Sequence, residues 1–189
     1  MNKFGAALII SSCFIGNLNA QAEPPPPPPP LIWQAPLESE IKRYSNSKHG
    51  FSVEFPGAPE VTDRSFDIMN YYTVRRGGST MWVRVISFTK EDLEKVSNEE
   101  IIRQVKAAHS SYGKFKIVDV VNERSDAIEY SATDKLTFRR VNARIVNGKL
   151  FELYIDVTNW HILQDNYPEK AKAFNQEADR FFRSFLLLK

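Results

Sequence analysis

Apolar and polar residues alternate along most of the chain between residues 50 and 88, which predicts strands in this half. Pro56-Gly57 ends the first strand, and Gly77-Gly78 separates the last two as the turn of a hairpin. The predicted strands are Phe51–Phe55, Val61–Ile68, Asn70–Arg76 and Thr80–Phe88. Within Met81–Phe88 both faces are apolar, which indicates a strand buried on both sides. Arg84 interrupts this pattern, and we expect its guanidinium to reach the solvent at the sheet edge.

A helical pattern follows. Ser97-x-x-Glu100 is a capping box, and the apolar residues after it recur at helical spacing until Gly113. These residues are Ile101, Val105, Ala108 and Tyr112.

The second half returns to strands, predicted at Phe115–Val121, Ala127–Ser131, Lys135–Ile145 and Lys149–Thr158. Asn147-Gly148 favours a two-residue hairpin loop, but that loop would place the apolar set ending at Ile145 opposite to the set beginning at Phe151. We therefore predict a three-residue loop, Val146-Asn147-Gly148, with Gly148 left-handed in a bulge. Leu136 and Phe138 are out of phase with Val141–Ile145, which predicts a second bulge near Arg139-Arg140.

The chain closes with a helix. Pro168 suits its first turn, and an apolar stripe of Ala171, Phe174, Ala178, Phe181 and Phe185 predicts a principal core layer. Leu186–Leu188 is expected to continue as a short strand. The order of elements lacks the regular strand–helix alternation of parallel sheets, so we predict an α+β fold, a mainly antiparallel sheet packed by two principal helices.

The N-terminus resembles a secretory signal. Lys3 is followed by the apolar run Phe4–Ile15, and Ala20-Gln21-Ala22 offers a cleavage site, so residues 1–22 are interpreted as a signal peptide. Ile10-Ser11-Ser12-Cys13 also resembles a lipobox, in which Cys13 would carry a lipid anchor. We expect export, to a bacterial periplasm in particular, with attachment to the envelope as the alternative.

Seven prolines, Pro24–Pro30, cannot form helix interior or central strand. We interpret residues 23–43 as a stiff polyproline spacer and residues 44–189 as a single domain. A docking ligand for an aromatic groove is the alternative for the prolines. The chain has 25 basic and 23 acidic residues, and removal of Lys3 leaves a net charge of +1. This balance gives no electrostatic basis for binding nucleic acid or an anionic membrane.

Three stretches together resemble a known type of domain: GFSVEFPGAPE (Gly50–Glu60), VNARIVNGKLFELYIDV (Val141–Val157) and EADRFFRSFLLL (Glu177–Leu188). They are similar to PsbP-like and DcrB-like domains of exported bacterial proteins. The shared features are turns and core aromatic residues. The resemblance implies an α/β/α sandwich with a noncatalytic accessory or binding role, and it carries no catalytic residue over to this chain.

The candidate chemistry is sparse. His49, His109 and His161 have no partner at metal-ligand spacing, so no metal site and no cofactor are predicted. One candidate binding surface is the expected loop Thr158–Tyr167, which contains Trp160, His161 and Tyr167. A second is the group Arg139, Arg140 and Arg144 on the hairpin, in which Arg140 and Arg144 share the polar face and could meet anionic groups. Ion pairing with Glu152 or Asp156 across the hairpin is the simpler interpretation.

The sequence therefore predicts a noncatalytic exported accessory or binding protein that recognises an envelope protein or a small ligand. The alternatives are a lipid-anchored envelope component, through Cys13, and a hydrolase with an unrecognised site. His161 beside a carboxylate in a deep pocket would favour the hydrolase.

Overall fold

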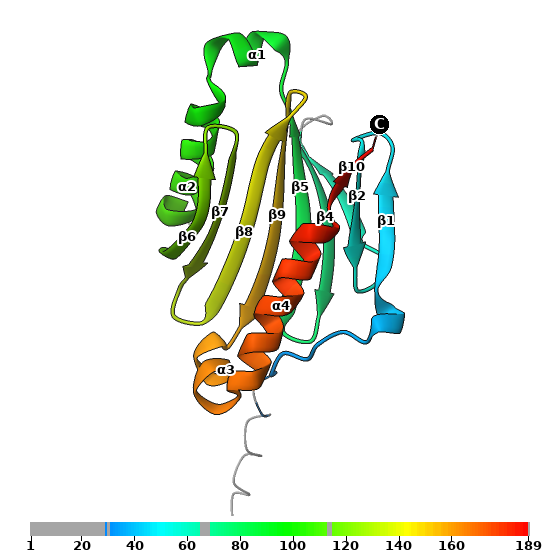
Figure 1. Ribbon diagram of the computed structural model, residues 1–189, viewed down its shortest axis with the longest axis vertical. Coiled ribbons are helices and arrows are strands. Elements are labelled where there is room, and N and C mark those ends of the chain that lie inside the picture. The colour runs from blue at the N-terminus through cyan, green and yellow to red at the C-terminus, as the bar shows by residue number, and fades with distance from the viewer. Residues whose placement is uncertain (1–28, 30, 65–68, 113–114, 189) are drawn as a thin grey trace, which may run out of the picture.

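Two antiparallel sheets and four α-helices form the domain in the computed structural model, which describes residues 29, 31–64, 69–112 and 115–188 (Figure 1). The large sheet has seven strands in the order β3 (Glu60–Arg64), β4 (Met69–Arg76), β5 (Ser79–Ser87), β9 (Lys149–Thr158), β8 (Thr137–Val146), β7 (Ala127–Thr133) and β6 (Lys116–Arg124). The small sheet has three, in the order β1 (Lys42–Asn46), β2 (Phe51–Phe55) and β10 (Leu186–Leu187). The predicted α+β class is confirmed, as are the Gly77-Gly78 hairpin and the short closing strand.

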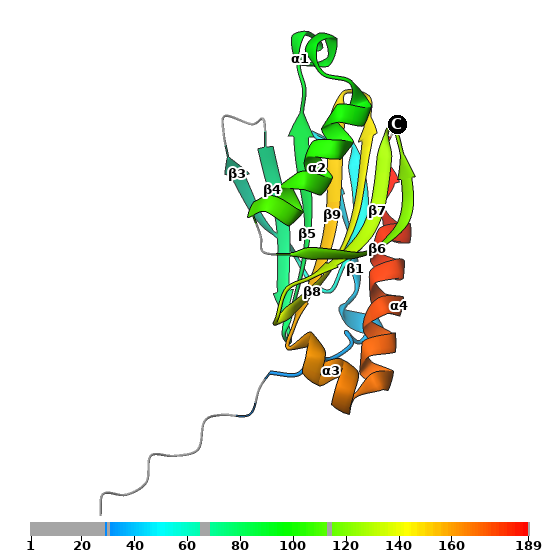
Figure 2. The same cartoon turned by 90° about the vertical axis from the view of Figure 1, so that its left-hand side faces the viewer.

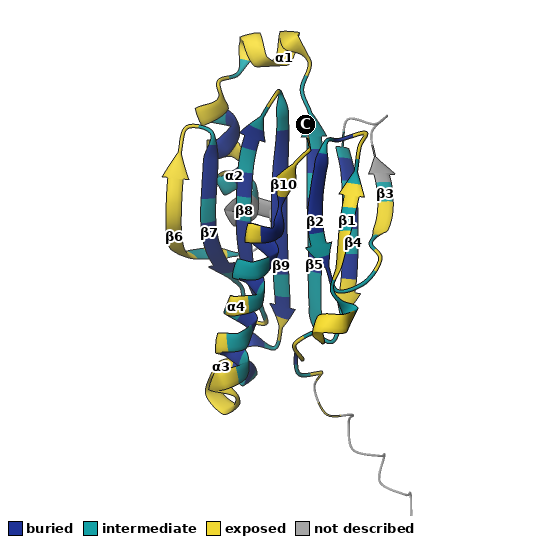
Figure 3. Cartoon of the chain, turned by 45° about the vertical axis from the view of Figure 1, so that its right-hand side comes forward, coloured by how far each residue is buried: buried dark blue, intermediate teal, exposed yellow. Residues whose placement is uncertain are grey.

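The large sheet has a hydrophobic core on each face. On one face lie the small sheet and α4 (Pro168–Ser184), preceded by the short α3 (Trp160–Asn166). The other face is partly covered by α2 (Asn98–Tyr112), which packs against β6, β7 and β8. α1 (Lys90–Lys95) precedes α2 and is mostly exposed, whereas the central strands are buried (Figure 3). The molecule is therefore layered, with helix, large sheet, and then helix with small sheet.

The hairpin β8–β9 corrects the predicted loop. Val146 pairs directly with Lys149, so the turn has two residues, and both Asn147 (φ 50°) and Gly148 (φ 71°) are left-handed. These are the backbone angles of a type I′ turn. The three-residue loop is wrong because it assumed a single apolar face. Both faces of β9 are covered, and its two sets of side chains belong to different cores.

The bulge predicted near Arg139-Arg140 is also wrong. β8 pairs with β9 in unbroken register from Thr137 to Val146. Phe138 and Val141 are out of phase because Phe138 enters the core under α4, whereas Val141 enters the core under α2. The register shifts lie instead between β6 and β7, after Ile117 and after Val120. Irregularities of this kind on an edge strand hinder edge-to-edge pairing with another chain.

The two predicted helices are confirmed, with small differences. Ser97 caps α2 through its hydroxyl, which accepts from the amide of Glu100 at 3.2 Å. Every residue of the predicted α4 stripe is buried, and Phe182 joins it. In α2, Ile101 and Val105 are buried as predicted together with Ile102, while the side chains of His109 and Tyr112 lie outside the described residues.

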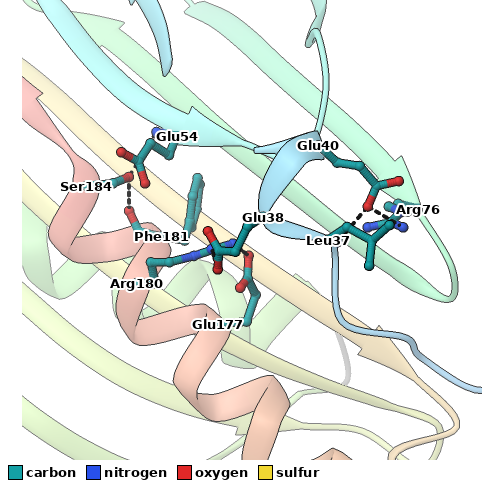
Figure 4. A network of polar contacts seen from close by, with 9 residues as sticks. All are labelled: Leu37, Glu38, Glu40, Glu54, Arg76, Glu177, Arg180, Phe181 and Ser184. Carbon is teal, nitrogen blue, oxygen red and sulfur yellow. Dashed lines mark hydrogen bonds and ion pairs between the residues drawn. The ribbon is translucent and has the colours of Figure 1, made fainter. Parts of the chain in front are cut away.

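The packed part of the chain reaches further toward the N-terminus than residue 44. Trp33 is 2% exposed and meets the Phe174 ring edge-on at 5.5 Å. The following 3₁₀ turn, η1 (Glu38–Glu40), is held by two ion pairs, from Arg180 to Glu38 at 2.9 Å and from Arg76 to Glu40 at 2.7 Å (Figure 4). The predicted signal peptide, Cys13 and the prolines before Pro29 lie outside the described residues.

Candidate functional site

A hollow lies on the face of the large sheet that α2 covers only in part. α2 packs over β6, β7 and β8, while β3 stands clear of the helix (Figure 2). The hollow over β3, β4 and β5 has a volume of about 360 Å³. We call it the arginine slot and define it by three sets of residues. Its floor carries the hydroxyls of Thr62, Tyr71, Thr73 and Thr80, its arginines are Arg75, Arg84 and Arg139, and its wall is formed by Trp82 and Tyr154.

Strand register explains why these residues meet. Thr62 is paired with Tyr71 and Tyr71 with Arg84, while Thr73 is paired with Trp82. Directly opposite residues point to the same face of an antiparallel sheet, so three neighbouring strands contribute two adjacent rows of polar and aromatic side chains to this face. The residues between them on β4, Tyr72 and Val74, enter the opposite core.

Aromatic rings and one guanidinium build the wall of the slot. The Trp82 ring stacks on that of Tyr154 at 5.1 Å, with 27° between the planes. The guanidinium carbon of Arg139 lies 5.2 Å from the Trp82 ring centre and 4.4 Å from that of Phe115. Cation–π contacts of this kind fix the positions of partly buried rings. Trp82 is therefore held on its Tyr154 side, and the slot lies on its Thr73 side.

A buried carboxylate lies beneath the slot. Glu152 is 0% exposed and accepts hydrogen bonds from Arg84 Nε and, at 2.6 Å, from the Tyr154 hydroxyl. Arg84 Nη2 in turn donates to the Tyr154 oxygen at 3.1 Å. The prediction that Arg84 reaches solvent at a sheet edge is wrong, because β5 is an interior strand and Glu152 on the neighbouring β9 provides a counterion.

Charge is segregated across this site. Arg139 holds Asp156 with two hydrogen bonds of 2.8 and 2.7 Å, and both side chains are largely shielded from solvent. Burial acts to lower the pKa of Arg84, but Glu152 outweighs it and leaves that pKa raised. Burial, followed by the charge of Glu152, raises the pKa of Tyr154 well above its ordinary value. The slot therefore presents guanidinium groups and hydroxyls to a ligand, and the carboxylates of Glu152 and Asp156 are paired with two of these guanidinium groups.

A second, more apolar hollow of about 560 Å³ lies between α1, α2 and the far end of β5. Ile86, Phe88, Ile101 and Val105 line it, and Arg84 borders both hollows. Its polar lining residues are fewer than those of the arginine slot, so it offers less to fix the orientation of a ligand.

The predicted loop candidates do not form a single site. Residues Trp160–Asn166 are helical, so the expected irregular connection is wrong. Trp160 is buried and stacks on Phe138 at 4.2 Å, which makes it part of the core under α4. His161 is exposed, and Tyr167, 43% exposed, lies beside Lys170.

Arg140 and Arg144 lie on the face of β8 that faces α4, opposite to the face that carries Glu152 and Asp156. Pairing of these two arginines with those carboxylates is therefore wrong, whereas the third arginine of the predicted group, Arg139, does pair with Asp156. Arg140 is buried and binds Glu129 at 2.8 Å and Asp179 at 2.6 Å. Arg144 lies over the Phe185 ring at 5.1 Å and donates to Asn142.

The described histidines lie far apart. His49 is buried near Tyr72 in the turn between β1 and β2, at the opposite end of the molecule from α3, which carries His161 (Figure 1). Among the described residues, no three His, Cys, Asp or Glu side chains gather where they could hold a metal ion. In the same part of the chain, no helix is long and apolar enough to cross a membrane.

The slot itself was missed from the sequence. Its signal was present in β4, where Tyr71, Thr73 and Arg75 alternate with buried residues. That pattern shows a polar outer face, but it does not show that the helix α2 would leave this face open.

Comparison with known proteins supports the fold. No protein-family model and no curated protein sequence matches this chain. Among solved structures, the solution structure of cyanobacterial PsbP (CyanoP) from Synechocystis sp. PCC 6803 is similar, with a TM-score of 0.50 and 13% identity. The match covers 78% of this chain and 92% of that one. The PsbP-like fold predicted from the sequence is confirmed, and at this identity the likeness shows the fold alone.

Proposed function

We propose that this chain is a noncatalytic binding protein that recognises a small ligand in the arginine slot. The observation that carries the proposal is a hollow of about 360 Å³ lined by three arginines, three aromatic rings and several hydroxyls. Hollows that combine aromatic surface with a few convergent polar groups are the usual sites of ligand binding. The PsbP-like fold agrees with the accessory role that the resemblance implied.

The polar contacts of the slot favour binding over catalysis. Glu152 and Asp156 lie on the same face of the sheet as the slot, but both are paired with arginines, Arg84 and Arg139, and neither is among the described residues that line the hollow. A general base must reach the proton that it abstracts. The side chains at the slot surface therefore suit the fixing of a ligand better than the transfer of a proton.

A substitution that fills the slot tests this function. Thr73→Phe places a ring opposite Trp82, whereas Val118→Phe adds the same ring at an exposed position of the edge strand β6. We expect compounds from a library of small metabolites to raise the Tm of the wild type and of Val118→Phe, and the same compounds to have no effect on Thr73→Phe. Absence of any stabilising compound, or equal stabilisation of all three proteins, would contradict the proposal.

We also propose that the protein acts after export, in the periplasm. The support is the pattern of Lys3, the apolar run and Ala20-Gln21-Ala22. Intact-mass analysis of the protein from its native envelope is expected to show a chain that begins at Glu23. Diacylglycerol on Cys13 would establish the lipid-anchored alternative instead.

A further inference from the structure

The lining of the arginine slot has an uneven chemistry that limits what it can bind. Its main aromatic surface is on one side, where Trp82 stacks against Tyr154, and Tyr71 adds a third ring from β4. The remaining sides carry hydroxyl and guanidinium groups from β3, β4 and β5. A wholly aromatic ligand would leave most of these polar groups facing an apolar ring, which is costly because buried polar groups need partners.

Trp82 offers a flat surface for one face of a ring. Its Tyr154 side is occupied, and its Thr73 side borders the hollow. The face of an aromatic ring carries partial negative charge and attracts weakly positive C–H groups. A pyranose ring presents such C–H groups on one face and hydroxyls around its rim, so it suits one aromatic wall with polar surroundings.

The threonine hydroxyls on the floor of the slot suit a ligand that is rich in oxygen. The hydroxyls of Thr62, Thr73 and Thr80 can both donate and accept hydrogen bonds, as sugar hydroxyls do. A volume of about 360 Å³ is in the range of small-molecule sites.

Arg75 gives the slot a preference for ligands that carry a negative charge. It pairs with Glu60 at 3.3 Å, but both side chains are 70% exposed, and a pair in this setting contributes little stability. Its guanidinium can therefore turn to a ligand at small cost and bind a carboxylate or phosphate through two parallel hydrogen bonds. Among the described side chains that line the slot there is no carboxylate to repel such a group.

We infer that the ligand of the arginine slot is an acidic sugar, in which a pyranose ring lies on Trp82 and its carboxylate or phosphate binds Arg75. This inference rests on the proposed function of the slot and gives the chemical class of its ligand. Arg84 and Arg139 also line the slot, and their pairing with Glu152 and Asp156 keeps these two arginines in place and leaves Arg75 as the arginine that can turn to the ligand.

Tryptophan fluorescence of the full chain tests the inference with four probes: glucuronate, glucose 6-phosphate, glucose and benzoate. Trp33 and Trp160 are buried in the opposite core, so a change caused by a ligand in the slot reports on Trp82, and Trp82→Phe should abolish it. We expect at least one of the two acidic sugars to bind about tenfold more tightly than glucose or benzoate, since one charge-assisted contact has about this effect. The stronger of the two acids identifies the anionic group.

Two arginine variants distinguish the slot from general surface charge. Arg75→Gln should weaken binding of the acidic sugar about tenfold. Arg124→Gln is the matched control, because Arg124 is also exposed and paired with a single carboxylate, Asp126, on another part of the sheet. Binding by Arg124→Gln should equal that of the wild type.

The inference is overturned if neither acidic sugar binds more tightly than glucose, if benzoate binds as well, or if Arg75→Gln binds normally. If the sugars fail while library compounds still bind in a way that Thr73→Phe prevents, the ligand class is wrong and the proposed function stands. If no compound binds in the slot, both are wrong.

Discussion

Phe181 and Phe185 show what single side chains contribute to the core under α4. The Phe181 ring lies 5.5 Å from that of Phe55, and Phe185 stacks on Phe51 at 5.9 Å. Phe181→Ala and Phe185→Ala should each lower the free energy of unfolding by about 3–5 kcal/mol, because each leaves a cavity between α4 and β2. Urea denaturation measures this, with the exposed Leu187→Ala as the control. If the unfolding free energies of both phenylalanine variants lie within about 0.5 kcal/mol of that of wild type, α4 is not packed in this way.

The buried hydroxyl of Tyr130 affects the stability of the protein at alkaline pH. Burial, followed by the charge of Glu152, raises the pKa of Tyr130 above the ordinary value of 10.0. Above pH 10 the unfolded chain therefore releases this proton while the folded protein keeps it, so stability falls as pH rises.

Tyr130→Phe should reduce this loss. Between pH 9 and 11 the variant should lose about 1.4 kcal/mol less unfolding free energy than wild type, the contribution of one tyrosine held neutral over that range. Urea denaturation across the range is the measurement, and the exposed Tyr167→Phe is the control. If the unfolding free energy of Tyr130→Phe falls with pH as much as that of wild type, the Tyr130 hydroxyl ionises in the folded wild-type protein as it does in the unfolded chain.

At the scale of elements, the two-residue turn between β8 and β9 fixes the register in which these two strands pair. Asn147 and Gly148 both have positive φ, which glycine adopts freely and other residues adopt at a cost. Gly148→Ala should therefore destabilise the protein by about 1–2 kcal/mol, whereas Asn147→Gly should change stability by less than about 0.5 kcal/mol. Urea denaturation of both variants checks this. Equal effects would mean that the two positions do not share the left-handed conformation.

Local patterns were sufficient to predict most elements but not which faces they bury. The α4 stripe from Ala171 to Phe185 was predictable because a helix with one apolar stripe has one buried side. β9 was misjudged because its polar residue Glu152 is fully buried. A sequence does not show that Arg84, 68 positions earlier, would be the partner of that carboxylate.

The same limit explains the candidate site. Arg140 was singled out because it is charged, but charge on a strand does not indicate exposure, and α4 and β7 provide its partners Asp179 and Glu129. Trp82 was assigned to a buried face, although α2 leaves that part of the sheet open. Sites formed where one layer ends depend on how far the covering helix extends, which is a property of the packed molecule.

At the scale of the whole molecule, the two faces of the large sheet differ in how completely other elements cover them. The face under α4 is closed by the small sheet, by α4 and by Trp33, and it contains the larger set of core aromatic residues. The face under α2 is covered most closely over β6–β8, and the arginine slot lies toward β3, β4 and β5. Substitutions in the closed face should therefore act on stability and leave the chemistry of the slot intact, since the sheet backbone separates the two.

Substitution of Trp33 tests whether the segment before β1 contributes to the stability of this closed face. Its ring is buried against Phe174, and the backbone beside it approaches Gly78, where a Cβ would lie 3.6 Å from the Trp33 nitrogen. Trp33→Ala should lower the free energy of unfolding by about 3–5 kcal/mol, as expected for a large aromatic residue removed from a core. Leu31→Ala, two residues earlier and 62% exposed, should change it by less than about 0.5 kcal/mol. Urea denaturation of the full chain measures both. If Trp33→Ala is as stable as wild type, the segment before β1 lies on the domain without stabilising it, and the fold begins near residue 44.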